Sequence, residues 1–202
     1  MSTAHAATLA SHAQAQTATG IPNGKLGMWV FLASEVMFFT GLIGAYIVLR
    51  MGLGAGWPGH EGHLNVVVGT LNTLVLICSS TTIVLALAAA EQQAVPAVRR
   101  WLLATILLGS AFLVIKGFEY GAKFSHHILP STNVFWSCYF ALTGFHALHV
   151  LGGIIFNGWV LASTATASRW TASARRLEFA GLYWHFVDIV WIFLFPMLYL
   201  FN

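Results

Sequence analysis

Five long apolar segments, separated by short connectors, dominate the hydrophobic pattern of the chain. Each runs for about 20 residues or more, the length that an α-helix needs to cross a hydrocarbon layer about 30 Å thick. The connectors concentrate Gly, Pro, Ser and basic residues, and none is long enough to fold as a domain. The pattern predicts an all-α polytopic membrane protein, a bundle of five transmembrane helices over Gly27–Leu49, Val66–Ala90, Trp101–Tyr120, Val134–Leu161 and Phe179–Phe201.

The first 24 residues form neither an apolar segment nor a short connector. They are rich in Ala, Ser, Thr and Gln, and they lack the charged start and apolar centre of a secretory signal. We expect residues 1–24 to form a flexible tail outside the membrane and residues 25–202 to form one membrane domain.

The composition supports the membrane assignment. Of 202 residues, 58% are hydrophobic and only 7% are charged, whereas roughly a quarter are charged in soluble domains. Cys78 and Cys138 both lie inside apolar segments, so the sequence predicts neither a disulfide framework nor a cysteine metal site. The formal charge of +3 arises from residues that border the spans, which excludes a nucleic-acid partner.

Basic residues also predict the orientation. The tail and every second connector lie on one side of the membrane and carry six basic residues: Lys25, Arg99, Arg100, Arg169, Arg175 and Arg176. The connectors on the other side carry two, Arg50 and Lys123. Because short cytoplasmic segments of membrane proteins are enriched in Lys and Arg, we expect a cytoplasmic N-terminus and a C-terminus outside.

A few ionisable residues lie within the predicted spans, where lipid would penalise them unless they face the bundle interior. Glu35 lies in the first span, His146 and His149 in the fourth, and His185 and Asp188 in the fifth. At 1.5 Å per residue, Glu35 and Asp188 fall about 12 Å from the cytoplasmic edge and the two histidines of the fourth span about 10 Å from it. These five residues, called the polar layer below, are predicted to be mutual partners.

Four interpretations of the polar layer follow from residue chemistry alone. It could be a hydrogen-bonded cluster that holds three helices together, a metal site using His-x-x-His and carboxylate ligands, a bis-histidine haem site, or a proton relay. Lys116 and Glu119 form a separate polar pair toward the outer end of the third span. The metal interpretation corresponds to an alternative function, an independent membrane enzyme with a His/carboxylate metal site.

Several motifs along the chain point to one family. Gly27–Gly41 reads GMWVFLASEVMFFTG, Tyr139–Val150 reads YFALTGFHALHV and Tyr183–Leu194 reads YWHFVDIVWIFL, while shorter matches occur at Asn72–Thr73 and Phe118–Tyr120. With this order and spacing, the chain resembles subunit III of the haem-copper terminal oxidases, in a five-helix bacterial form related to the subunit III of quinol oxidases. The mitochondrial-type subunit has seven helices, and the first two have no counterpart here.

The resemblance implies an accessory role in a complex that reduces oxygen to water and pumps protons. It implies no catalytic residue, haem, copper or other metal on this chain, with haem and copper in partner subunits. It further implies contact with catalytic subunit I and other oxidase subunits, bound phospholipid and a place in the bacterial cytoplasmic membrane, and it leaves a respiratory supercomplex open. By the same resemblance, Glu35 matches the family's intramembrane carboxylate, and His146, His149, His185 and Asp188 match its polar core, in support of assembly and sustained proton uptake.

Overall fold

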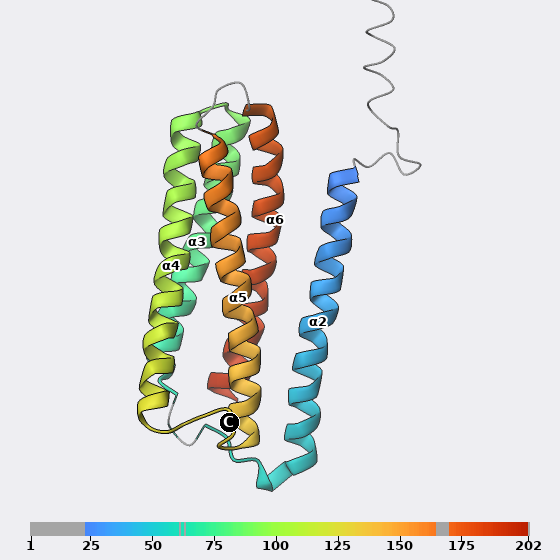
Figure 1. Cartoon of the computed structure of the whole chain (residues 1–202), viewed down its shortest axis with the longest axis vertical. Coiled ribbons are helices and arrows are strands. Elements are labelled where there is room, and N and C mark those ends of the chain that lie inside the picture. The colour runs from blue at the N-terminus through green and yellow to red at the C-terminus, as the bar shows by residue number, and fades with distance from the viewer. Residues whose placement is uncertain (1–22, 61, 63, 165–169, 202) are drawn as a thin grey trace, which may run out of the picture. The chain divides into compact units, whose positions relative to one another are not determined.

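The described part of the chain consists of helices and turns, without strands (Figure 1). The structure is a computed structural model that describes residues 23–60, 62, 64–164 and 170–201. Its elements are α2 (Asn23–Leu53), η1 (Gly54–Gly56), α3 (Val66–Glu91), α4 (Val95–Ser125), α5 (Val134–Ser163), α6 (Trp170–Phe195) and η3 (Pro196–Leu200). Within the described ranges, five helices are long and apolar enough to span a membrane, which confirms the predicted fold class.

The predicted tail, residues 1–24, lies outside the described residues except for Asn23 and Gly24, which begin α2. The prediction of a flexible tail therefore remains a prediction. Arg169, which contributed to the predicted basic side, also lies outside the described residues.

The chain divides into two compact units, Met1–Met37 and Phe38–Asn202, with the boundary inside α2. In the second unit, α3 packs against α4 and α6, and α5 packs against the same two helices, which gives a four-helix bundle (Figure 1). The part of α2 in this unit contacts the bundle through side chains. Phe38 meets Phe145 edge to face at 5.2 Å between ring centroids, and the Tyr46 hydroxyl donates to the Met197 carbonyl at 3.2 Å.

Local chemistry explains several helix ends. The Asn65 Oδ1 atom accepts from the Val67 and Val68 amides and so caps α3, while Asn133 caps α5 by accepting from the Trp136 amide at 2.9 Å. Near the C-terminus, α6 ends before Pro196 and a π-helical turn follows it. Proline has no amide hydrogen to continue the α-helical hydrogen bonding.

Large aromatic side chains fill the bundle interior. Trp184, Trp191, Tyr139, Tyr199 and Phe112 are all fully buried. In contrast, large apolar side chains are exposed along the spans, among them Leu107, Ile155 and Phe193, each more than 60% exposed. An apolar exterior of this kind is suited to lipid and not to water.

Candidate functional site

His146 is the most enclosed member of the polar layer. The residue is fully buried, and its ring stacks on Trp191 at 5.0 Å and meets the edge of Phe112 at 5.6 Å. Neither ring nitrogen has a hydrogen-bond partner among the described residues. Such a nitrogen is costly to bury unless water or another chain supplies the missing bond.

His149 lies one turn further along α5 and meets different neighbours. Its Nδ1 atom is 2.7 Å from the Phe145 carbonyl oxygen of its own helix, and its ring packs against the edge of Phe39 at 5.0 Å. The backbone carbonyl of His149 accepts a hydrogen bond from the Tyr183 hydroxyl at 3.0 Å. Through these contacts, His149 links α5 to both α2 and α6.

His185 and Asp188 lie beside α3. The His185 Nδ1 atom is 2.8 Å from the Ser80 hydroxyl oxygen, so the recorded partner of this imidazole is a serine that we did not predict. Asp188 is 5% exposed, and neither carboxyl oxygen has a hydrogen-bond partner in the described part of the chain. Both residues line a cavity of about 350 Å³ between α3 and α6, together with Thr73, Ser80 and Trp191.

Glu35 lies half-buried on α2 in the unit Met1–Met37, whereas the other four residues of the polar layer belong to the unit Phe38–Asn202. The relation of Glu35 to those four residues therefore stays a prediction. Across the described residues, no group of three or more His, Cys, Asp or Glu side chains is placed to hold a metal ion. The alternative of an independent metalloenzyme accordingly finds no support in the ligand geometry.

A second polar site lies near the end of α4, where Lys116, Glu119 and Lys123 form what we call the ion cluster. Glu119 accepts from the Lys116 ammonium at 3.0 Å and from the Lys123 ammonium at 2.9 Å. The two lysines are only 5% and 4% exposed, and Glu119 is 12% exposed. The spacing of three and four residues places all three side chains on one face of the helix.

Two tyrosines complete the ion cluster. The Tyr139 and Tyr199 hydroxyls donate to the Glu119 Oε1 atom at 2.8 and 2.6 Å, and each also accepts from the Lys116 ammonium. The Lys116 ammonium lies 4.7 Å from the centroid of the Trp191 ring, and the Lys123 ammonium lies 5.1 Å from that of Tyr139. Aromatic faces stabilise cations by electrostatic attraction to the ring.

The position of Lys123 differs from the sequence prediction, which assigned it to a connector beginning at Gly121. The helix continues to Ser125, so Lys123 is part of α4 and its side chain is buried. The signal was present in the sequence, since Lys116, Glu119 and Lys123 follow helical spacing. Tyr139 and Tyr199 carried no comparable signal because they come from α5 and η3.

Fold and sites together define a polytopic helical membrane protein with polar side chains buried among aromatic rings. The family model described as Cytochrome c oxidase subunit III matches residues 3–202. The chain is 42% identical to "Cytochrome c oxidase subunit 3" of Corynebacterium diphtheriae over 87% of this chain and 86% of that one. It is 38% identical to the protein of the same name from Thermostichus vulcanus over 87% of this chain and 86% of that one, and 34% identical to that from Alkalihalophilus pseudofirmus over 95% and 93%.

The chain therefore belongs to the cytochrome c oxidase subunit III family, as its motifs predicted. It is a subunit III of a haem-copper oxidase and a component of an oxidase complex.

Proposed function

We propose that the chain is a non-catalytic subunit of its oxidase, with the haem and copper centres held by partner subunits and subunit I as its main contact. The observation that carries this proposal is the family match over residues 3–202. The surroundings of two histidines add to it, because the buried His146 is packed between aromatic rings and the half-buried His185 lies beside a serine hydroxyl. These surroundings suit a packing role better than metal ligation.

The polar layer is proposed to fix helix geometry and to support proton supply to the catalytic subunit during turnover. Asp188 gives this part of the proposal its support, since its carboxyl group lines the cavity between α3 and α6 and makes no geometrically ideal hydrogen bond to any of the described residues. A cavity of about 350 Å³ has room for several water molecules at about 30 Å³ each. Water there would supply the missing hydrogen bonds and could carry protons.

The proposed setting is the bacterial cytoplasmic membrane, with a cytoplasmic N-terminus, an external C-terminus and bound phospholipid. The distribution of basic residues supports the orientation. Apolar side chains exposed along the spans support contact with lipid.

The test is to purify the oxidase with and without this chain and to measure its haem, its copper and the time course of oxygen uptake. We expect equal haem and copper per catalytic subunit and a near-normal initial rate in both preparations. The preparation without this chain should lose activity sooner during turnover. Loss of a stoichiometric metal together with this chain would contradict the proposal.

A further inference from the structure

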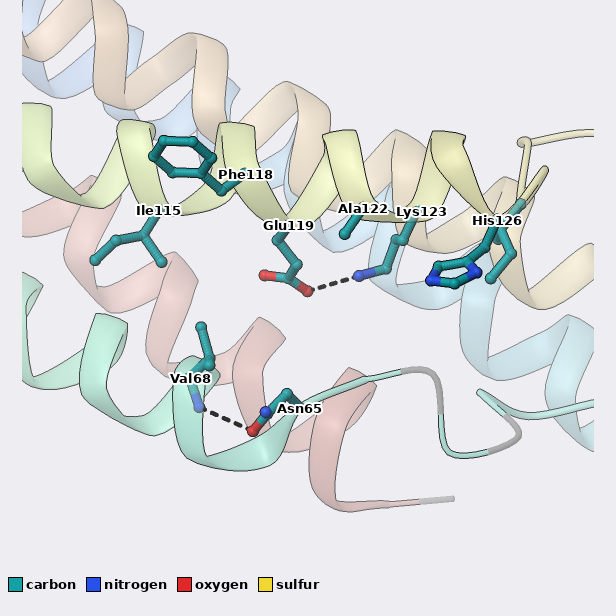
Figure 2. Close-up of a pocket in the computed structure, with 9 residues that line it drawn as sticks. Asn65, Val68, Ile115, Phe118, Glu119, Ala122, Lys123 and His126 are labelled. Atoms are coloured by element: carbon teal, nitrogen blue, oxygen red, sulfur yellow. Dashed lines mark hydrogen bonds and ion pairs between the residues drawn. The ribbon is translucent and has the colours of Figure 1, made fainter.

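A cavity of about 450 Å³ lies beside the ion cluster, between the start of α3 and the end of α4 (Figure 2). One part of its lining is polar and consists of Asn65, Glu119, Lys123 and His126, as Figure 2 shows. The remainder is apolar and includes Val68, Ile115 and Phe118. The lining therefore suits a ligand that is itself polar at one end and apolar at the other.

The ion cluster carries an excess of positive charge, because two ammonium groups share one carboxylate. Lys116 donates to Glu119, Tyr139 and Tyr199, which uses all three hydrogens of its ammonium group. Among the described residues, the Lys123 ammonium group donates one hydrogen bond, to Glu119. The Lys123 ammonium group also lies over the Trp136 and Tyr139 rings, and its side chain lines the cavity, where its hydrogens that are not bonded to Glu119 can reach a ligand.

The single carboxylate has little capacity left for another donor. Its Oε1 atom accepts from Lys123, Tyr139 and Tyr199, and its Oε2 atom accepts from Lys116. An excess cation at a largely buried position is costly unless a counter-charge and hydrogen-bond partners accompany it. An anion bound in the cavity would supply a counter-charge in addition to the aromatic faces that already contact the two ammonium groups.

We propose that this cavity binds the phosphate headgroup of an anionic phospholipid, with Lys123 and His126 as its donors. A histidine ring carries at least one N–H donor in either charge state, so His126 can contribute whether or not it is charged. Bound phospholipid is part of the proposed function, and this inference rests on it. It adds the place of binding and the negative charge of the headgroup.

Position in the fold favours a lipid over a soluble anion. The span of α3 begins at Val66 and that of α4 ends at Ser125, so the polar part of the cavity lies at the end of the spans, where lipid headgroups are found. The apolar part extends along α4 toward Phe118 and Ile115, and Phe118 is 76% exposed. An acyl chain can follow this surface toward the centre of the bilayer.

The experiment uses the intact purified oxidase in nanodiscs of phosphatidylcholine with a small fraction of phosphatidylglycerol. Native mass spectrometry counts the phosphatidylglycerol molecules retained per complex as that fraction is varied. We expect Lys123→Met to lose one retained molecule, with apparent affinity about tenfold to a hundredfold weaker, since a hydrogen bond to a charged group is removed. Lys123→Arg keeps the charge and should retain the lipid.

A matched pair of variants at two adjacent histidines tests the proposal if Lys123→Met fails to assemble. His126→Ala removes an exposed side chain that lines the cavity and should weaken retention, whereas His127→Ala removes its neighbour, which does not line it, and should not. Equal retention in the wild type and in either Lys123→Met or His126→Ala would overturn the proposal.

Two further outcomes would identify a different occupant and also overturn it. Full competition by inorganic phosphate in the buffer would indicate a free anion, and release of a partner subunit from Lys123→Met without loss of lipid would indicate an acidic side chain of that subunit. Haem content, copper content and the time course of oxygen uptake are recorded on the same samples. They report on the proposed accessory role independently of the lipid count.

Discussion

Glu119 is the residue on which the buried charges of α4 converge, because it accepts hydrogen bonds from two lysines and two tyrosines. We predict that Glu119→Gln lowers the thermal stability of the oxidase more than Lys116→Met does. The glutamine variant leaves both ammonium groups without a carboxylate, and breaking a buried pair in this way costs about 3–5 kcal/mol. In Lys116→Met, the pair of Glu119 with Lys123 survives. The midpoint of thermal inactivation of the purified complex measures the difference.

The double variant Lys116→Met with Glu119→Gln provides the control for this prediction. It retains one buried ammonium group where Glu119→Gln retains two, so it should be less destabilised than Glu119→Gln alone. Residues in one hydrogen-bonded network are expected to show such non-additive effects. If the two single-variant losses simply add in the double variant, the ion cluster does not act as a unit.

Asp188 offers a second prediction, on the cavity between α3 and α6. Asp188→Leu should shorten the active lifetime of the oxidase during turnover more than Asp188→Asn does, because an amide still binds water in the cavity and leucine does not. Progress curves of oxygen uptake measure the lifetime, and the yield of intact complex controls for assembly. Identical lifetimes for the two variants at normal yield would remove Asp188 from the proposed proton supply.

Sequence patterns identified many of the polar residues but few of their partners. Lys116 and Glu119 could be paired because they are three residues apart on one helix. His185 and Ser80 are 105 residues apart, and Tyr199 and Glu119 are 80 apart. A single sequence does not record which helices lie side by side, so those contacts required the structure.

At the scale of elements, Trp184 of α6 contacts three helices, two of them at glycines and the third at a serine hydroxyl. A Cβ atom added to Gly109 of α4 would lie 2.6 Å from the Trp184 ring, and one added to Gly153 of α5 would lie 2.7 Å from it. The indole nitrogen donates to the Ser79 hydroxyl of α3 at 3.0 Å. The glycines thus allow α4 and α5 to approach a fully buried tryptophan.

We predict that Gly153→Ala destabilises the oxidase and that Gly158→Ala does not. The first substitution places a methyl group against the Trp184 ring, and overpacking of this kind costs about 1–3 kcal/mol. Gly158 lies on the same helix with nothing within 4 Å of an added Cβ atom, and alanine favours helix there. Thermal inactivation of the two purified variants makes the comparison, and a loss of similar size in both would show that close approach to Trp184 is not the cause.

Helix lengths show what the hydrophobic pattern could not predict. The third span was predicted as Trp101–Tyr120, whereas α4 runs over Val95–Ser125. A hydrophobic window identifies the part of a helix in the hydrocarbon layer, but a helix can continue through the headgroup layer with polar residues. Lys123 lies in that added part, beyond the predicted end at Tyr120, whereas Lys116 and Glu119 of the same ion cluster lie within the predicted span.

At the scale of the whole molecule, the distribution of basic residues predicts the orientation. On the predicted outer side, both basic groups are engaged: the Arg50 guanidinium donates to the Phe201 carbonyl at 2.7 Å, and Lys123 is paired with Glu119. The opposite side includes Arg100 and Arg175, which are exposed. The larger number of basic residues on the side of Arg100 and Arg175 supports the proposed cytoplasmic N-terminus.

Cysteine labelling in intact cells tests this orientation. In a background with Cys78 and Cys138 replaced, we expect Ser131→Cys, in the connector between α4 and α5, to react with a membrane-impermeant maleimide. Gln92→Cys, in the connector between α3 and α4, should react only after the cells are opened. Both native residues are exposed, so accessibility in the fold does not distinguish them. Labelling of Gln92→Cys alone in intact cells would reverse the predicted orientation.

The last prediction concerns Glu35 of α2, whose position in the predicted span would place its carboxyl group about 12 Å into the membrane. Retaining a carboxyl group at that depth costs a few kcal/mol, so its removal does not threaten insertion of the helix. We expect Glu35→Ala to assemble with unchanged haem and copper and to begin turnover at a near-normal rate, because the proposed function places all redox chemistry in partner subunits. Its active lifetime should be shorter if the carboxyl group supports proton supply.

Ser34→Ala is the matched control for Glu35→Ala, since it removes an adjacent polar group whose hydroxyl donates to the Phe31 carbonyl of the same helix at 2.6 Å. Progress curves of oxygen uptake and metal analysis are recorded on the same preparations of both variants. A shorter lifetime in Glu35→Ala alone would support proton supply through this carboxyl group, whereas equal lifetimes would limit Glu35 to packing. Immediate loss of activity together with a stoichiometric metal would contradict the accessory role itself, because it would place a redox or metal centre on this chain.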